Sequence, residues 1–327
     1  MADYSSLGSQ VDIEGDLAVE ATTCDDQRLD DGDMKIFRRS QGGTWIEETW
    51  DDSDVKSGFA TAAVGTDQIV VDRGYSYVIY QQSESVWRPI DLLEQHGPSR
   101  LSVANDHVLC VSSGGIAVIA EINSEGFANV RQVTDTGRKD FIRGASLSRN
   151  RALIPGRPDD VIVLERSGSN WIEQMRIAPP DNAPVESYFG RSTDLDEQHG
   201  IIGAPTHDGA GRGKGTGAAY LYDLESLGKA PLLLPCPETG EMTSFGWAVA
   251  IRGEVALVSN PHVQRGLAPG RVYVYHRNPD TDAWHYGETL QASNAEPGDE
   301  FGTSIAFDDG WAIIGAKSSW VYFFEIR

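Results

Sequence analysis

The feature that most constrains the fold of this chain is an internal repeat, because a unit that recurs along a sequence folds as a repeated piece of structure. In its clearest copies, a Phe-Gly pair precedes a short apolar run by about ten residues: Phe189-Gly190 before 201–204, Phe245-Gly246 before 256–258 and Phe301-Gly302 before 312–316. Weaker copies put the corresponding positions of all the units at residues 8, 58, 98, 142, 190, 246 and 302. Seven units of about 49 residues predict a seven-bladed β-propeller that occupies residues 1–327 as one domain.

Each unit divides into four short segments with the composition of strands. The first alternates large and small apolar side chains, as in 248–251, and the second is the short apolar run. The third is richest in β-branched and aromatic residues, as in 272–275 and 321–324, and the fourth begins near a tryptophan (Trp45, Trp87, Trp171, Trp284). Because neighbouring blades cover both faces of a blade, both faces must be apolar. We therefore predict an all-β fold with four-stranded antiparallel blades.

The glycine of the Phe-Gly pair is expected to have a structural role. It permits a positive φ, or a close approach of two backbone segments, where the chain enters the crowded innermost strand. Proline after the second strand, as in Gly203-Ala204-Pro205, cannot donate to a ladder and so ends the pairing. Ile142 stands at the glycine position of the fourth unit, where a positive φ would be strained, so that turn is expected to differ.

The last unit is too short for four strands of its own, because the chain ends at residue 327. We predict that residues 2–6 supply its fourth strand and close the ring, since this pairing would cover a sheet edge. Deleting residues 1–6 is then expected to lower the melting temperature markedly. An unchanged melting temperature would reject this closure.

Charge and cysteine content restrict the partners. The chain has 27 Lys and Arg against 49 Asp and Glu, a net charge of −22, which repels phosphate backbones and anionic membrane surfaces. We therefore expect no nucleic-acid partner, whereas a basic partner, or solubility alone, agrees with the charge. Three cysteines (Cys24, Cys110, Cys236) are too few for a disulfide framework and are expected to be free thiols. No segment has the length and apolarity of a signal peptide or a transmembrane span, so no membrane insertion is expected and the compartment stays open.

The motif residues also resemble a known family. Phe189-Gly190, Gly203-Ala204-Pro205 and the following 217–222 (Gly-Ala-Ala-Tyr-Leu-Tyr) resemble the FG-GAP repeat, which forms the propeller head of integrin α-chains and occurs in many bacterial and algal proteins. The Gly-Thr-Trp at 43–45 and Ser-Asn-Trp at 169–171 resemble the microbial type. The resemblance covers essentially the whole chain and is strongest in the last three units. It implies a propeller, recognition or adhesion, and secretion as a mature form, with a cytoplasmic location as the alternative.

The resemblance raises the question of calcium, which integrin-like propellers hold between their first and second strands. Such a site needs several carboxylates on a long loop that supplies 6–8 oxygen ligands. Here the connections are tight turns, as at 14–16, 149–151, 252–254 and 308–310, so integrin-type calcium loops are absent and no cofactor is predicted. A separate acidic cluster in the first unit is a candidate cation site, with a solvated turn-rich loop as the alternative: Asp25, Asp26, Asp30, Asp31 and Asp33.

Loop lengths indicate where a partner could bind. The loops between second and third strands are long in units 1, 5 and 6 (22–32, 205–217, 261–270) and short in the others, and all of them leave one face of a propeller. The glycine-rich 209–217 lacks the spacing of a phosphate-binding loop and is interpreted as one of these loops. We predict a low sector over blades 2–4, walled by blades 1 and 5, as the partner's seat. The candidate contact residues on this face are Asp72, Arg73, Tyr75, Arg157, Asp159, His207, Arg212, Lys214 and His262.

The function expected from these observations is a non-catalytic recognition or adhesion scaffold that binds a protein or a glycan through this loop face. Aromatic side chains there would favour a glycan, whereas the net charge favours a basic protein surface. Two alternatives stay open. One is a structural subunit of a larger assembly, and the other is a polysaccharide-acting enzyme that uses loop carboxylates.

Overall fold

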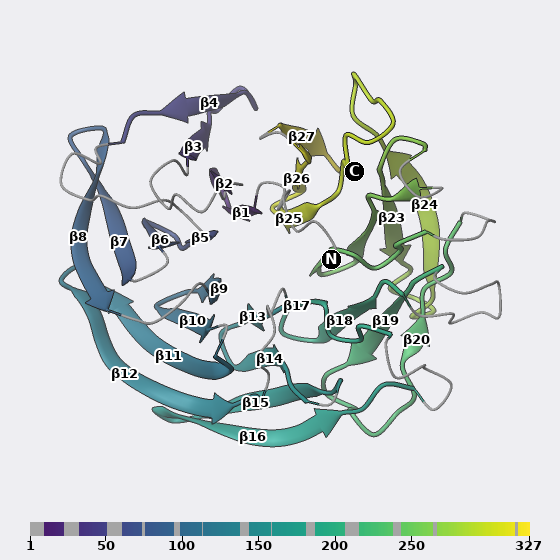
Figure 1. Cartoon of the computed structure of the whole chain (residues 1–327), viewed down its shortest axis with the longest axis horizontal. Coiled ribbons are helices and arrows are strands. Elements are labelled where there is room, and N and C mark those ends of the chain that lie inside the picture. The colour runs from purple at the N-terminus through teal and green to yellow at the C-terminus, as the bar shows by residue number, and fades with distance from the viewer. Residues whose placement is uncertain are drawn as a thin grey trace, which may run out of the picture.

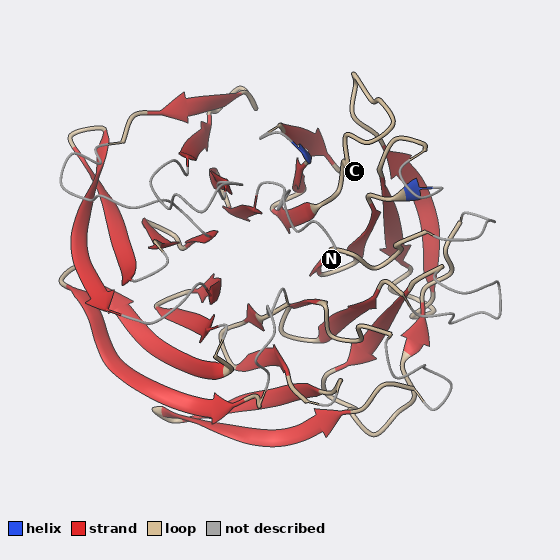
Figure 2. Ribbon diagram, in the orientation of Figure 1, coloured by secondary structure: helices blue, strands red, loops and turns tan. Residues whose placement is uncertain are grey.

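A computed structural model of the protein describes residues 10–22, 33–50, 61–73, 76–94, 99–112, 114–137, 144–157, 159–180, 187–206, 216–237, 243–263, 267–317 and 320–327. In these residues the chain forms seven sheets that stand radially around one axis, in chain order (Figure 1). Strands and loops make up almost all of this structure, and helix is confined to short fragments (Figure 2). No helix in the described residues is long and apolar enough to cross a membrane.

We call each sheet a blade and name its strands a to d from the axis outwards. Blade 1 contains β1 (Gln10–Glu14), β2 (Leu17–Thr22), β3 (Asp33–Arg39) and β4 (Trp45–Glu48). Blade 2 contains β5 (Thr61–Val64), β6 (Gln68–Asp72), β7 (Ser76–Ser83) and β8 (Val86–Glu94). Blade 3 contains β9 (Ser99–Ala104), β10 (His107–Ser112), β11 (Ile116–Asn123) and β12 (Gly126–Asp135). Blade 4 contains β13 (Ser146–Leu147), β14 (Arg151–Pro155), β15 (Val161–Ser167) and β16 (Asn170–Ile177).

The last three blades carry the clearest sequence repeats. Blade 5 contains β17 (Ser192–Leu195), β18 (His199–Ala204), β19 (Ala218–Asp223) and β20 (Leu232–Leu233). Blade 6 contains β21 (Val249–Arg252), β22 (Val255–Asn260), β23 (Arg271–Arg277) and β24 (Trp284–Leu290). Blade 7 contains β25 (Ser304–Asp308), β26 (Trp311–Gly315) and β27 (Val321–Glu325).

The predicted all-β, seven-bladed antiparallel propeller is confirmed. Six blades have four strands each, and blade 7 has three in the described residues. The proposed fourth strand, residues 2–6, lies outside the described residues, so closure by the N-terminal segment stays a prediction. The positions 8, 58, 98 and 142 also lie outside them.

The ring closes through side-chain packing between blades 1 and 7. The innermost strands β1 and β25 contact each other, as do the innermost strands of every other neighbouring pair of blades. Val11 and Ile13 of blade 1 share a buried cluster with Ala306 and Ile313 of blade 7. Burying an aliphatic side chain of this size contributes about 1.5–3 kcal/mol. Hydrophobic clusters between blades therefore hold each blade to the next around the circle.

The Phe-Gly glycines have the conformation that the sequence analysis expected. Gly190, Gly246 and Gly302 have φ of 80, 89 and 95°. Gly246 also lies against the preceding blade, where an added Cβ would come within 2.1 Å of the Ala218 carbonyl oxygen. On that blade, a Cβ on Gly217 would come within 2.1 Å of the Phe245 carbonyl oxygen. The Phe-Gly pair of one blade therefore lies directly on the glycine that precedes strand c of the blade before it.

Tryptophans at the start of strand d join neighbouring blades. Trp45 and Trp284 are the first residues of β4 and β24, as predicted, whereas Trp87 and Trp171 are the second residues of β8 and β16. Three of them have a ring contact with the first residue of strand b in the preceding blade. The centroid distances are 5.9 Å for Trp311–Trp45, 6.2 Å for His107–Trp171 and 5.9 Å for His199–Trp284.

The described cysteines agree with the expectation of free thiols. Cys110 and Cys236 form no disulfide, and Cys24 lies outside the described residues. Cys110 is buried in the apolar strand β10, and burial raises the pKa of its thiol well above the usual range. This thiol is therefore a neutral, apolar core group.

Candidate functional site

The face that bears the b–c and d–a loops was the expected partner-binding face. The strand bounds reproduce the predicted loop lengths: long after β2, β18 and β22, and short after β6, β10, β14 and β26. Two of the candidate residues, Asp72 and Arg73, are fully buried in blade 2. The Arg73 guanidinium donates to the Tyr80 hydroxyl and lies 5.8 Å from the centroid of the Tyr80 ring. The structure therefore places these two residues inside the protein.

Of the other residues predicted to contact a partner or a cation, the structure describes only some. Arg157 is exposed and Asp159 is half-buried, both in the loop after β14. Tyr75, His207, Arg212 and Lys214 lie outside the described residues, as do Asp25, Asp26, Asp30 and Asp31 of the acidic cluster. Asp33 begins β3, but its side chain is not described. Among the residues that the structure does describe, no three His, Cys, Asp or Glu side chains come together in a group that could hold a metal ion.

Among the described candidates, His262 lies in a network of side chains between blades. Its ring lies 4.6 Å from that of Trp247, and the Trp247 ring centroid lies 3.5 Å from the Arg191 guanidinium carbon. On the other side, His262 Nε2 lies 3.9 Å from Glu300 Oε2, and Lys317 Nζ lies 3.4 Å from Glu300 Oε1. These five residues, which we call the rim cluster, link blades 5, 6 and 7.

The sequence repeat brings the rim cluster together. Arg191 and Trp247 each follow the Phe-Gly pair of their blade, and Glu300 precedes the pair of blade 7. His262 and Lys317 follow strand b of blades 6 and 7. Glu300 meets His262 in the b–c loop of the preceding blade, Trp247 meets His262 of its own blade, and Arg191 meets Trp247 of the following blade. Sequence reasoning identified only His262, although the position next to the glycine was a usable signal for Arg191 and Trp247.

Three exposed apolar side chains lie in loops of the same face as the rim cluster. Tyr188, Leu267 and Trp320 are 51, 76 and 58% exposed, and they lie in the d–a or b–c loops of blades 5, 6 and 7. The other large hydrophobic side chains that are exposed in the described residues all lie on outer strands: Ile46, Ile90, Leu92, Val130, Ile172, Leu232 and Tyr286. In the described part of the loop face, the exposed large apolar side chains lie over blades 5–7, whereas the sequence predicts the partner's seat over blades 2–4.

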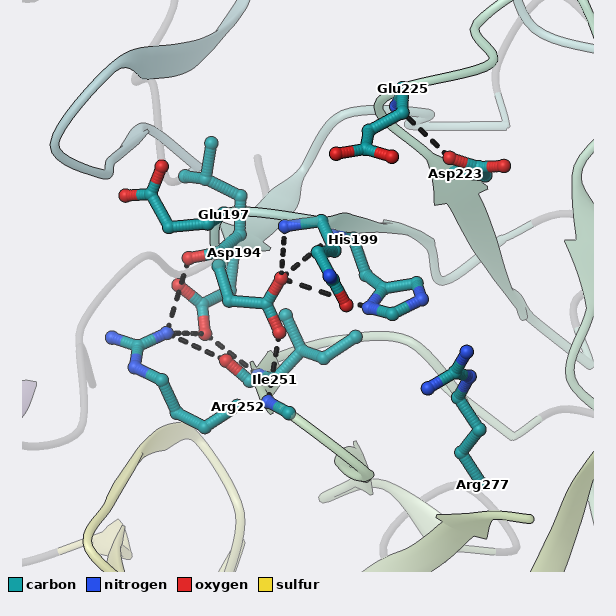
Figure 3. Close-up of polar contacts among 12 residues, drawn as sticks. Asp194, Glu197, His199, Asp223, Glu225, Ile251, Arg252 and Arg277 are labelled. Carbon is teal, nitrogen blue, oxygen red and sulfur yellow. Dashed lines mark hydrogen bonds and ion pairs between the residues drawn. The ribbon is translucent and has the colours of Figure 1, made fainter. Parts of the chain in front are cut away.

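A central channel runs along the axis and is lined by the innermost segments of all seven blades. It has a volume of about 80 Å³. On its wall, Arg252 Nη1 lies 3.0 Å from Asp194 Oδ2, and Arg252 Nε lies 3.7 Å from Asp308 Oδ1. The same Asp194 oxygen accepts a 2.7 Å hydrogen bond from the Ile251 N–H (Figure 3). These contacts connect blades 5, 6 and 7.

Burial governs the ionisation of the channel carboxylates. It raises the pKa of Asp12 to about 7, although the Val64 and Ile13 N–H groups and Arg252 favour the charged form. Burial also raises the pKa of Asp194, with Arg252 opposing the shift, and the Asp194 carboxylate raises the pKa of Arg252 further above its usual range. The channel is well below the 300–1,000 Å³ of typical small-molecule sites. We interpret its charges as links between blades.

The architecture is that of a β-propeller, with loops of unequal length on one face and a narrow axial channel. A family model for the FG-GAP repeat matches residues 284–319, which run from β24 through Phe301-Gly302 to the loop after β26. Together with the seven-bladed ring, this match over one repeat supports an FG-GAP β-propeller family.

Two solved structures resemble the fold. A chain in the crystal structure of the mitotic checkpoint complex aligns with a TM-score of 0.62 and 10% identity, covering 100% of this chain and 92% of that one. The computationally designed protein Ika8 aligns with a TM-score of 0.55 and 12% identity, covering 97% of this chain and 82% of that one. At these identities the likeness concerns the fold alone. No curated protein sequence matches the chain.

Proposed function

We propose that this propeller is a non-catalytic recognition scaffold that binds a protein through the loop face over blades 5–7. The observation that carries the proposal is that three exposed apolar side chains lie in the loops of this face: Tyr188, Leu267 and Trp320. Aromatic residues and arginine are enriched in protein–protein interfaces, and a buried aromatic anchor often dominates the affinity. A glycan partner, which the sequence also permitted, has less support on this face because the rings there are mixed with aliphatic and charged groups.

The contacts within the rim cluster support the same proposal. The rim cluster holds Trp247 between Arg191 and His262, and Glu300 lies between His262 and Lys317. A surface whose side chains are already ordered loses less conformational entropy on binding. The net charge of −22 favours a partner with a basic surface, through faster association and better orientation. Binding is then expected to weaken as the ionic strength rises.

The test is quantitative binding of the full chain to a partner that is first captured from the native host and then purified. Trp320→Ser and Leu267→Ser are each expected to weaken binding by about tenfold or more, which is about 1.4 kcal/mol or more. Their melting temperatures should be unchanged, because both side chains are largely exposed. Replacing the b–c loop of blade 5 by a short Gly-Ser turn should also weaken binding.

Ile172→Ser and Val130→Ser are the matched controls, because these side chains are exposed on outer strands away from the face. Both controls should bind like the wild type. Unchanged binding of the Trp320 and Leu267 variants would reject the face, and so would equal losses in the controls. Shortening of a polysaccharide by the purified protein would favour the enzymatic alternative, and obligate equimolar co-purification would favour the structural subunit.

A further inference from the structure

A second cavity, of about 300 Å³, opens between blades 5 and 6 and belongs to neither the rim face nor the channel. Its walls come from the start of β18, the end of β19, the c–d loop of blade 5 and the facing ends of β23 and β24. In a propeller, the a–b turns and c–d loops lie on the face opposite the b–c loops. This lateral cavity is therefore remote from the rim cluster.

The cavity exists because the outermost strand of blade 5 is almost absent. β20 has two residues, and it pairs with β19 only at Tyr220↔Leu233 and Leu221↔Leu232. In blade 6, by contrast, β24 pairs with β23 from Val272↔Leu290 to Arg277↔Trp284. The outer edge of β19 at Tyr222 and Asp223 thus has no strand d over it, and the lateral cavity lies at this edge.

One wall of the lateral cavity is aromatic and apolar. It contains Trp284, Leu221 and Leu232, and Leu232 is 47% exposed. The His199 ring also lines the cavity and meets the Trp284 ring edge to face, at 5.9 Å and 83°. An aromatic wall next to an exposed leucine can cover one face of a small ring-shaped ligand.

The other walls are polar and already ordered. Asp223 accepts a 3.0 Å hydrogen bond from the Glu225 N–H and lies 3.4 Å from Lys229 Nζ. Although burial opposes ionisation, these contacts lower the pKa of Asp223, so it is charged at neutral pH. Arg277 Nε donates to Asp282 Oδ1 at 2.6 Å. Figure 3 shows His199, Asp223, Glu225 and Arg277 around one space.

We propose that the lateral cavity binds a neutral saccharide of one or two rings. A sugar has an apolar ring face for the aromatic wall and hydroxyl groups that both donate and accept for the polar walls. The carboxylates of Asp223, Glu225 and Asp282 outnumber the cations of Lys229 and Arg277, which disfavours phosphorylated and sulfated ligands. The volume lies at the lower end of the ~300–1,000 Å³ range of small-molecule sites, which suits one or two rings rather than a folded polypeptide.

The chain contains its own structural control for this site. Trp171 occupies the position of Trp284 in blade 4 and contacts His107 at 6.2 Å, as Trp284 contacts His199. Over His107 and Trp171 the outer strand β12 is ten residues long. The histidine–tryptophan contact alone is therefore a link between blades. What distinguishes blades 5 and 6 is the uncovered edge beside that contact.

The experiment measures binding of the full chain to a panel of neutral mono- and disaccharides by calorimetry and by ligand-observed NMR. At least one neutral sugar should bind the wild type, and Trp284→Ala should weaken binding by about tenfold or more. Glu225→Ala should weaken it as well. Because the Glu225 side chain is exposed and its contact with Asp223 uses the backbone N–H, this variant keeps the fold and decides the test if Trp284→Ala does not fold.

Trp171→Ala is the matched control and should bind the sugar like the wild type. Trp320→Ser on the rim should also leave sugar binding unchanged, so failure of this proposal is distinguishable from failure of the proposed protein-binding function. The proposal is overturned if no neutral sugar binds, if a phosphorylated sugar or a cationic peptide binds more tightly than the neutral sugars, or if Trp171→Ala loses binding as Trp284→Ala does.

Discussion

The contact between blades 3 and 4 and the contact between blades 5 and 6 use the same aromatic pair but different supporting structure. In both, the histidine that begins strand b meets the tryptophan near the start of strand d in the next blade. Between blades 3 and 4, the long β12 covers this pair and Arg131 Nη1 donates to Asn170 Oδ1 of β16 at 2.7 Å. Between blades 5 and 6, β20 is too short to do so and the lateral cavity opens.

Near the axis, the same two pairs of blades also differ, and there blades 5 and 6 have the closer contact. Blades 5 and 6 meet through the Gly217–Phe245 backbone bridge and the Asp194–Arg252 ion pair. Blades 3 and 4 meet there through a hydrogen bond from the Leu147 N–H to Ser102 Oγ, at 3.0 Å. Among the described residues, the close inner packing of blades 5 and 6 accompanies an open outer edge, whereas blades 3 and 4 share a neutral inner hydrogen bond and a covered outer edge.

The largest loss of unfolding free energy is expected at Gly246, where blades 5 and 6 approach each other most closely. Gly246→Ala combines a left-handed backbone with a Cβ inside the Ala218 carbonyl, so we expect a loss of about 3–5 kcal/mol of unfolding free energy. Gly253→Ala also has a positive φ but meets no atom within 4 Å, and should cost about 1–2 kcal/mol. Urea unfolding followed by circular dichroism measures both. Equal losses would show that close packing is not what requires glycine at position 246.

The next largest loss of unfolding free energy is expected from removing the polar contacts near the axis, between blades 5 and 6 and between blades 3 and 4. Asp194→Ala removes the acceptor of the Ile251 N–H and the nearest carboxylate of Arg252, and should cost about 2–4 kcal/mol. Ser102→Ala removes only the acceptor of the Leu147 N–H and should cost about 1 kcal/mol. Denaturant midpoints at neutral pH give both values. A larger loss for Ser102→Ala would invert the comparison.

A pH-dependent effect is expected at Asp12, which accepts a 2.9 Å hydrogen bond from the Val64 N–H between blades 1 and 2. Its pKa is raised from 3.8 to about 7, so the folded state binds the proton more tightly than the unfolded state does. Stability from this group is therefore present below about pH 4 and is lost as the pH rises from about 4 to 7. Asp12→Asn keeps an acceptor without the charge.

Melting temperatures of wild type and Asp12→Asn across this pH range test that assignment. The variant should gain in melting temperature relative to the wild type as the pH rises, with the difference levelling off above about pH 7. The Ser102 hydroxyl accepts the Leu147 N–H hydrogen bond and carries no charge. Ser102→Ala should therefore shift the melting temperature by the same amount at all these pH values. A pH-independent difference for Asp12→Asn would contradict the raised pKa.

The smallest effect is expected at the covered outer edge. Arg131→Ala removes an exposed hydrogen bond between β12 and β16 and should cost about 0.5 kcal/mol or less. Thermal unfolding at low and high salt measures it. A loss above about 1 kcal/mol would show that the outer strands, rather than the inner ones, hold blades 3 and 4 together.

The fold was predictable to the level of individual strands, because its signals are local. The spacing of the Phe-Gly pairs indicated seven blades, and the glycine after each phenylalanine indicated the positive φ found at Gly190, Gly246 and Gly302. Tryptophans marked the beginnings of the outer strands within one residue. The candidate site was less predictable: Asp72 and Arg73 look like loop residues in the sequence but are buried in blade 2.

The sequence by itself determined which segments become strands and how many blades they build, since alternating apolar residues and glycine turns act within about ten residues of chain. Only the tertiary structure decided that Arg191, Trp247 and Glu300 meet on one rim, and that Trp284 borders an open cavity while Trp171 lies beside a full outer strand. These contacts join residues of different blades, about 50 positions apart. Whether the tryptophan borders a cavity depends on how completely strand d covers the neighbouring blade, which no local pattern around the tryptophan records.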